Sequence, residues 1–166
     1  MRLEPTKRGG FRRTGVAQKQ SADVTRQRSE ARTLPPVLVK LNEKLGLPTC
    51  PYLIRWRIET RWGSIRLHHW LASDDQRNFH DHPWDFITLV IRGGYVDRSP
   101  SGDEHLKAGR LAFRSSEHQH TVYPDPGGAW TLVFTGPKVR NWGFWVAGKF
   151  KKANKYFLTY GHHPCN

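Results

Sequence analysis

The middle of the sequence contains the stretch Arg77-Asn78-Phe79-His80-Asp81-His82-Pro83-Trp84-Asp85, in which two histidines lie two positions apart just before a β-rich run. Alternate side chains of an extended chain share one face, so His80 and His82 can both point into one cavity. Neutral imidazoles bind iron, zinc, copper or nickel. The spacing therefore predicts two ligands of a divalent transition metal.

A third ligand is expected from a neighbouring strand, and the segment from Gly109 to Val122 contains His118 and His120. Together the two segments resemble the motifs of the cupin family. The first motif places His-x-His before a carboxylate and a later glycine, and the second places a glycine, a short strand, a turn and a histidine. Gly93 and Gly109 match the glycines, and His120 matches the second-motif histidine. The resemblance implies an all-β fold, a small antiparallel barrel or jelly roll.

The departures from the family pattern define the expected ligand set. Counting from Gly93, the family's glutamate ligand falls at Phe86, whereas Asp85 is one residue out of phase and is expected to face the other way unless the strand bulges. The second-motif turn has Ser115 and Glu117 in place of the family's proline and glycine. The simplest site then has three histidine ligands, similar to the ferrous-iron site of the thiol dioxygenases. Its expected ligands are His80, His82 and His120, with His118 and Asp85 in reserve.

More of the chain, residues 51–145, resembles a group of poorly characterised cupin-like proteins from bacteria and phages. This likeness implies a fold but no particular activity. The matching segments are Tyr52-Leu53-Ile54-Arg55-Trp56, Leu67-His68, Ser73-Asp74-Asp75, Phe79-His80-Asp81-His82-Pro83-Trp84, Arg92-Gly93-Gly94-Tyr95, Thr135-Gly136-Pro137 and Arg140-Asn141-Trp142-Gly143-Phe144.

The rest of the pattern predicts short strands around this site. Eight segments have β-rich composition, and turn signals such as Arg92-Gly93-Gly94 and Asp125-Pro126-Gly127-Gly128 separate several of them. The predicted strands are 52–59, 64–71, 86–91, 95–98, 110–114, 120–123, 130–134 and 142–146. Seven Trp, eight Phe and five Tyr suggest a small, aromatic-rich core.

We expect residues 1–33 to form a flexible basic arm, 34–50 a linker and short helix, 51–147 the barrel and 148–166 a C-terminal extension. Val37, Leu38, Leu41 and Leu45 are spaced as one helical face, which predicts the helix. The arm has almost no hydrophobic pattern.

The net charge of +13 favours encounters with anions. Residues 1–34 hold nine Lys/Arg and three acids, so the arm is a candidate for phosphate contacts with nucleic acid or an acidic protein surface. The residues singled out there are Arg8, Arg12, Arg13, Arg26 and Arg28. The chain has no long apolar run, and its two cysteines, Cys50 and Cys165, are expected to be free thiols, which suggests a cytoplasmic protein, or one in the host cytoplasm or virion if phage-encoded.

These sequence features are compatible with several functions. The first is a metal-dependent cupin enzyme, an Fe(II) oxygenase or, with Zn, Ni or Mn, an isomerase or hydrolase. In this reading Arg140 faces the cavity mouth and orients a small anionic substrate, while His68, Tyr95 and Tyr123 supply a proton or hydrogen bond. The alternative is a non-catalytic scaffold whose arm binds nucleic acid or packs in a phage assembly. A metal-free barrel that stacks a sugar or nucleotide on its tryptophans, and a homodimer, also remain open.

Overall fold

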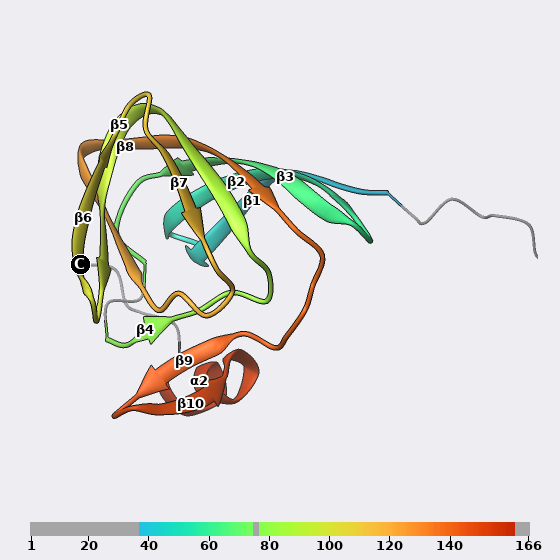
Figure 1. Cartoon of the computed structure of the whole chain (residues 1–166), viewed down its shortest axis with the longest axis vertical. Helices are drawn as coiled ribbons and strands as arrows, with labels where there is room; N and C mark the ends of the chain where they lie inside the picture. Colours follow the sequence, from blue (N-terminus) through green and yellow to red (C-terminus); the bar gives the residue numbers. More distant parts are fainter. Residues whose placement is uncertain (1–36, 75–76, 162–166) are drawn as a thin grey trace, which may run out of the picture. The chain divides into compact units, whose positions relative to one another are not determined.

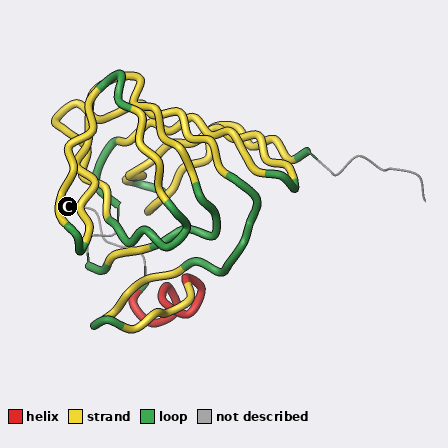
Figure 2. Tube along the Cα trace, in the orientation of Figure 1, coloured by secondary structure: helices red, strands yellow, loops and turns green. Residues whose placement is uncertain are grey.

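The computed structural model of the chain describes residues 37–74 and 77–161, all within one compact unit. Strands make up nearly all of its regular structure (Figure 2). The elements are β1 (Leu38–Leu47), β2 (Cys50–Thr60), β3 (Gly63–Trp70), β4 (Phe79–His80), β5 (Phe86–Ser99), β6 (Gly102–Lys107), β7 (Leu111–Arg114), β8 (Thr121–Thr135), β9 (Gly143–Val146), β10 (Lys149–Lys152) and α2 (Ala153–Tyr160). In the described part of the chain, no helix has the length and apolar character needed to cross a membrane.

The strands form two antiparallel sheets. The larger sheet has the order β1-β2-β3-β8-β5-β6, with β7 also paired to β5, and it curls into a barrel-like wall (Figure 1). The smaller sheet has the order β10-β9-β4. The prediction of an all-β fold with antiparallel strands is therefore confirmed.

The predicted helix from Val37 to Leu45 is wrong, because this segment forms β1. Its pairing with β2 runs from Leu38 opposite Glu59 to Leu47 opposite Cys50, interrupted by a bulge after Lys40. Short apolar runs fit a strand as well as a helix, and the long hairpin partner decides between them. Part of the expected linker thus belongs to the large sheet.

Two predicted turns lie inside long strands. Arg92-Gly93-Gly94 is a register shift within β5, and residues 125–128 form an irregularity within β8 at the same point of the ladder. Gly93 has a φ of 72°, and a Cβ there would lie 2.1 Å from the carbonyl oxygen of Gly128. Only glycine permits both this conformation and this close approach.

The core of the larger sheet is small, as expected, but it is not rich in tryptophan. Its fully buried members are mostly aliphatic: Val90, Tyr95, Leu106, Ala112, Val122 and Ala129. No tryptophan of the described residues is among the buried hydrophobic side chains. Trp56 and Trp130 stack on each other with ring centroids 5.8 Å apart and remain partly accessible.

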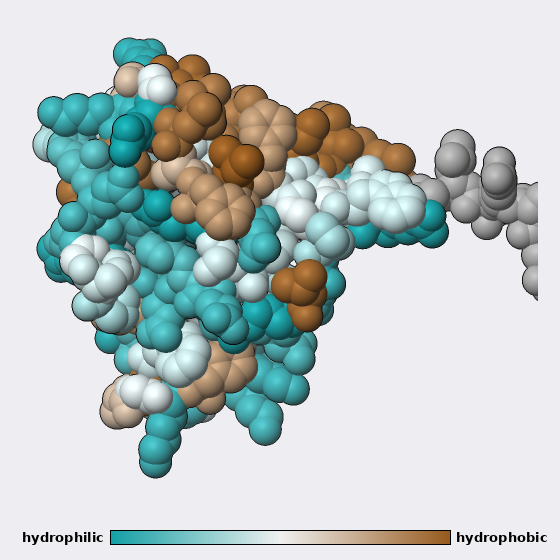
Figure 3. Space-filling view, in the orientation of Figure 1, coloured by the Kyte–Doolittle hydropathy of each residue, from teal (hydrophilic) through white to brown (hydrophobic). Residues whose placement is uncertain are grey.

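An apolar row crosses the outer face of the large sheet. Each member faces the next across the ladder, and every one is at least two-fifths exposed. In Figure 3, brown apolar side chains gather over the region of β1, β2 and β3. The row consists of Val39, Ile58, Ile65, Phe134, Ile87 and Phe113.

The smaller sheet and α2 hold β4 in place. Phe144 of β9 stacks on the fully buried ring of Tyr156 in α2, with ring centroids 3.8 Å apart. Phe144 also pairs with His80 across the ladder. The packing of the C-terminal elements therefore fixes the strand that carries the first histidine.

Cys50 is disulfide-bonded, so the expectation of a free thiol is wrong for this residue. Whether two sulfur atoms come close enough to bond depends on tertiary structure, which the sequence alone does not report. The sequence holds one other cysteine, Cys165, which lies outside the described residues.

Candidate metal centre

Three histidines converge between the two sheets. His80 ends β4, His82 follows two residues later, and His120 comes directly before β8. The backbones of His80 and His120 exchange two N–H···O hydrogen bonds of 2.9 Å. One ring nitrogen of each histidine lies within 4.8 Å of the others, and the Nε2 atoms of His82 and His120 are 3.0 Å apart. This donor set fits a divalent transition metal.

The middle residue of the motif, Asp81, does not line the cavity and contacts β9 instead. Asp81 is fully buried and accepts hydrogen bonds from the backbone N–H of Gly143 (2.8 Å) and the indole Nε1 of Trp145 (3.1 Å). Arg140 lies 2.9 Å from its second oxygen. Asp81 therefore ties the histidine segment to β9.

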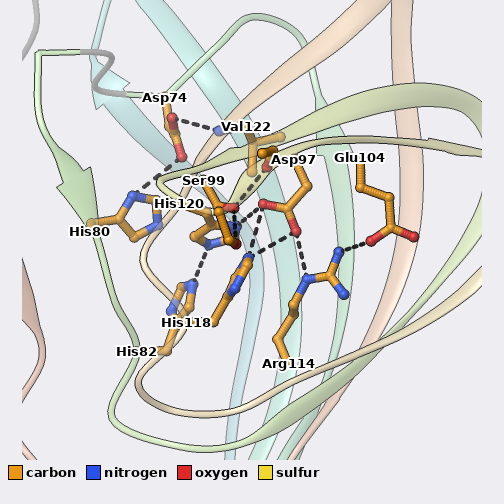
Figure 4. A network of polar contacts seen from close by, with 12 residues as sticks. Asp74, His80, His82, Asp97, Ser99, Glu104, Arg114, His118, His120 and Val122 are labelled. Carbon is orange, nitrogen blue, oxygen red and sulfur yellow. Dashed lines mark hydrogen bonds and ion pairs between the residues drawn. The ribbon is translucent and has the colours of Figure 1, made fainter.

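One carboxylate orients His120, and a second lies near His80 (Figure 4). Asp97 Oδ1 lies 2.8 Å from Nδ1 of His120, and Asp74 Oδ2 lies 3.6 Å from Nδ1 of His80. The Asp97 contact leaves Nε2 of His120 facing the cluster. A carboxylate on the far nitrogen fixes the ring and its tautomer and raises its basicity as a ligand.

The imidazoles of His80 and His82 are held neutral. Burial lowers the pKa of His80 and His82 well below the ordinary value, and neighbouring histidines lower it further. Burial alone would raise the pKa of Asp97, but hydrogen bonds from His118, His120 and Arg114 lower it well below its usual range. Metal binding requires neutral imidazoles, and the lowered pKa values of His80 and His82 meet this requirement.

The buried histidines should make the metal-free protein sensitive to acid. Burial, with the charges of Arg55 and Arg66, lowers the pKa of His68 to about 3. Below pH 6.5 the unfolded chain therefore binds protons that the folded chain does not. As the pH is lowered, the free energy of unfolding decreases by up to about 1.4 kcal/mol per pH unit for each such histidine. Urea unfolding of chelator-treated protein at pH 7 and pH 5 measures this loss. His68→Gln should reduce the loss, and an equal loss in both proteins contradicts the assignment.

The reserve ligands lie outside the three-histidine group. His118 Nε2 is 3.1 Å from Asp97 Oδ2, and these two residues form a second candidate group with His120. Asp85 is exposed and accepts a hydrogen bond of 2.7 Å from the backbone N–H of Ser116. Asp85 thus accepts a backbone hydrogen bond from the turn at Ser116 and belongs to neither candidate metal-binding group.

A cavity of about 460 Å³ adjoins the three histidines. Its volume suits a small molecule. Of the residues expected to contact substrate, His68 and Tyr95 line it. Burial raises the pKa of Tyr95, so its phenol stays protonated.

Two expectations about the cavity need correction. Arg140 is not among the lining residues, because Asp81 and the carbonyl oxygen of Ser116, 2.7 Å from its Nη1, hold its guanidinium. Tyr123 lies outside the lining as well, since it alternates with the inward Val122 and packs beneath the guanidinium of Arg98. The arm residues Arg8, Arg12, Arg13, Arg26 and Arg28 lie outside the described residues.

Sequence reasoning missed three residues at this site: Asp74, Asp97 and Arg66. Arg66 was not among the predicted site residues, yet it is 8% exposed and lines the cavity. Its place on β3, two residues before His68, was the available signal, because alternate residues of a strand share a face. Asp97 contacts His120 from 23 residues away, which no local pattern reports, whereas Asp74 lies only six residues before His80.

No family model and no curated protein matches the chain. Among solved structures, it is similar to one reported for the DMSP lyases RdDddP and RnDddQII (15% identity, TM-score 0.44, 51% of this chain and 47% of that chain). It is also similar to Fe(II) HppE (14% identity, TM-score 0.48, 61% of this chain and 56% of that chain). A third similar structure is an RmlC-like cupin from Shewanella frigidimarina (14% identity, TM-score 0.46, 57% of this chain and 85% of that chain).

The chain thus spans about half the length of the first two of these structures. Likeness at this level does not assign an activity or a substrate. The antiparallel barrel and the converging histidines of the chain itself agree with what the cupin resemblance implies.

Proposed function

We propose that this chain is a metal-dependent cupin enzyme in which His80, His82 and His120 bind one divalent transition metal. The observation that carries the proposal is the convergence of three imidazoles at the wall of a cavity, of which His120 is buried and His80 and His82 are kept neutral by their lowered pKa. Structural metal sites use four protein ligands, whereas three ligands leave positions open for substrate. A cavity beside such a site favours catalysis over a purely structural role.

Within this class we propose an Fe(II)-dependent oxygenase that acts on a small anionic substrate. The ligand group contains no carboxylate, and three imidazoles can bind ferrous iron as well as zinc, copper or nickel, so the choice of iron rests on the resemblance to the thiol dioxygenases. When bound, iron would supply redox chemistry with dioxygen. Zinc, nickel or manganese in the same site would instead supply Lewis-acid chemistry for an isomerase or hydrolase.

The chain's own residues would position the substrate and control protons. The phenol oxygen of Tyr95 holds its proton at neutral pH and can donate a hydrogen bond into the cavity. His68 stays neutral because burial lowers its pKa. Apolar side chains of the wall, such as Leu53 and Phe144, exclude water.

The alternative function, a scaffold with a nucleic-acid-binding arm, depends on residues outside the described part of the chain. No contact among the described residues favours it. It remains the proposal to adopt if the site binds no metal.

Metal analysis of protein purified without chelators, followed by anaerobic Fe(II) titration and oxygen-uptake assays with small carboxylates, tests the proposal. We expect about one equivalent of metal per chain and oxygen uptake that depends on iron. Zinc or nickel that iron does not replace would exclude the oxygenase but retain the metal enzyme. A chain that takes up none of these metals would overturn the whole proposal.

A further inference from the structure

Arg66 is a buried arginine with no carboxylate partner among the described residues. It is 8% exposed, and its Nε donates a hydrogen bond of 2.7 Å to the hydroxyl of Ser64. The neighbouring strand shows the contrast, because Arg55 Nη2 lies 2.7 Å from Glu43 and Arg57 also pairs with a glutamate. A buried charge without a counter-ion costs stability.

The guanidinium of Arg66 lies near the candidate metal centre. Its central carbon is 4.5 Å from the ring centroid of Trp84, and the ring of Trp84 is 4.8 Å from that of His82. Arg66 and all three histidines line the same cavity. One small molecule in this cavity could therefore contact both Arg66 and the centre.

A second polar group of the wall also lacks a partner. Nε2 of His68 is buried and has no hydrogen-bond partner among the described residues. Arg66 and His68 are two positions apart on β3 and therefore share one face of the strand, and both line the cavity. Two unpartnered polar groups on one wall are what a ligand with a polar end would satisfy.

We propose that Arg66 is the anion-binding residue of the cavity, and that the ligand is a small carboxylate-bearing molecule whose other end extends toward His80, His82 and His120. His68 Nε2 makes a further hydrogen bond to this ligand. Only the direction of the ligand toward the histidines rests on the proposed function. The binding of the carboxylate itself requires no metal.

The guanidinium geometry favours a carboxylate over a phosphate. Because Nε is occupied by Ser64, the two terminal nitrogens remain, and they match the two oxygens of a planar carboxylate. Lys44, Arg55 and Asp74 also line the cavity, but Arg55 is paired with Glu43, so Arg66 is the lining arginine without a carboxylate partner among the described residues. Burial lowers the pKa of Arg66 to about 10, so it is still charged at neutral pH.

The test measures ligand affinity of the full chain, with zinc and after chelation, by calorimetry. The probes are butyrate, 3-methylbutyrate and phenylacetate, their uncharged amides, and inorganic phosphate. We expect at least one of the carboxylates to bind with and without metal, and Arg66→Gln to weaken that binding at least about tenfold, as loss of a charge-assisted pair implies. Arg66→Lys keeps the charge but loses the pair of terminal nitrogens, so its carboxylate affinity should lie between those of the native chain and Arg66→Gln. The matched control Arg98→Gln removes a half-exposed arginine and should bind as the native chain does.

Thermal unfolding provides a readout that does not depend on the ligand. Without ligand, Arg66→Gln should melt at or above the native temperature, because it removes an unpaired buried charge. A native chain that binds no carboxylate, equal affinity in Arg66→Gln, or tighter binding of phosphate or the amides would overturn the inference. Carboxylate binding through Arg66 in a chain that takes up no metal would refute the proposed enzyme and leave this inference standing.

Discussion

His120→Ala is expected to reduce bound metal from about one equivalent per chain to near zero, because two remaining imidazoles do not make a stable site. His120 has the strongest support of the three ligands, since Asp97 holds its Nδ1 at 2.8 Å and its Nε2 faces His82 at 3.0 Å. His80→Ala and His82→Ala should lose the metal as well. Elemental analysis and anaerobic titration of each purified variant provide the measurement.

Asp97→Asn tests whether Asp97 orients the ring of His120 without itself binding the metal. It keeps the size of the side chain but removes the charge that fixes the His120 ring, so metal affinity should fall about 10- to 100-fold without being abolished. His69→Ala is the control, because His69 stacks on Trp130 with ring centroids 4.2 Å apart and is absent from both candidate groups. Retained metal in His82→Ala, with loss in His118→Ala, would move the site to the group of Asp97, His118 and His120.

Asp81→Ala is expected to lower the free energy of unfolding by about 3 kcal/mol, near the lower end of the range for breaking a buried ion pair. The substitution leaves the N–H of Gly143 and the indole of Trp145 without their acceptor and Arg140 without its counter-ion. The estimate is at the lower end because the Arg140 side chain is 27% exposed. Urea unfolding of chelator-treated protein at pH 7 measures it.

Two further variants define what Asp81 contributes. Asp81→Asn can still accept one hydrogen bond and should be less destabilised than Asp81→Ala. Asp103→Ala breaks an ion pair with Arg98 in which both side chains are about half exposed, and it should cost no more than about 1 kcal/mol. If Asp81→Ala cost no more than Asp103→Ala, Asp81 would not tie β4 to β9.

Sequence alone was a good guide wherever the information is local. The two-residue period of an extended chain predicted that His80 and His82 point into one cavity, and both line the cavity in the structure. The glycine positions of the cupin resemblance pointed to His120 rather than His118, and His120 is the one whose ring joins the other two. These features depend on strand geometry, which every extended chain shares.

Other features depended on partners distant in the sequence. The segment from Val37 to Leu45 has a helical spacing, but its pairing with β2 makes it a strand. Two glycine-containing stretches read as turns, yet they are matching irregularities of β5 and β8 that only the ladder reveals. Backbone hydrogen bonds to a neighbouring strand outweigh a weak local preference.

The charged residues of the site show the same division. Sequence analysis selected Arg140 to face the cavity, but Asp81 pairs with it. Arg66, which was not a predicted site residue, lies in the wall without a carboxylate partner among the described residues. Sequence by itself determined the alternating histidines and the all-β fold, because the period of the chain encodes them. Tertiary structure decided which arginine is paired and which carboxylate orients His120, because Coulomb energy and hydrogen bonding depend on distances that folding alone establishes.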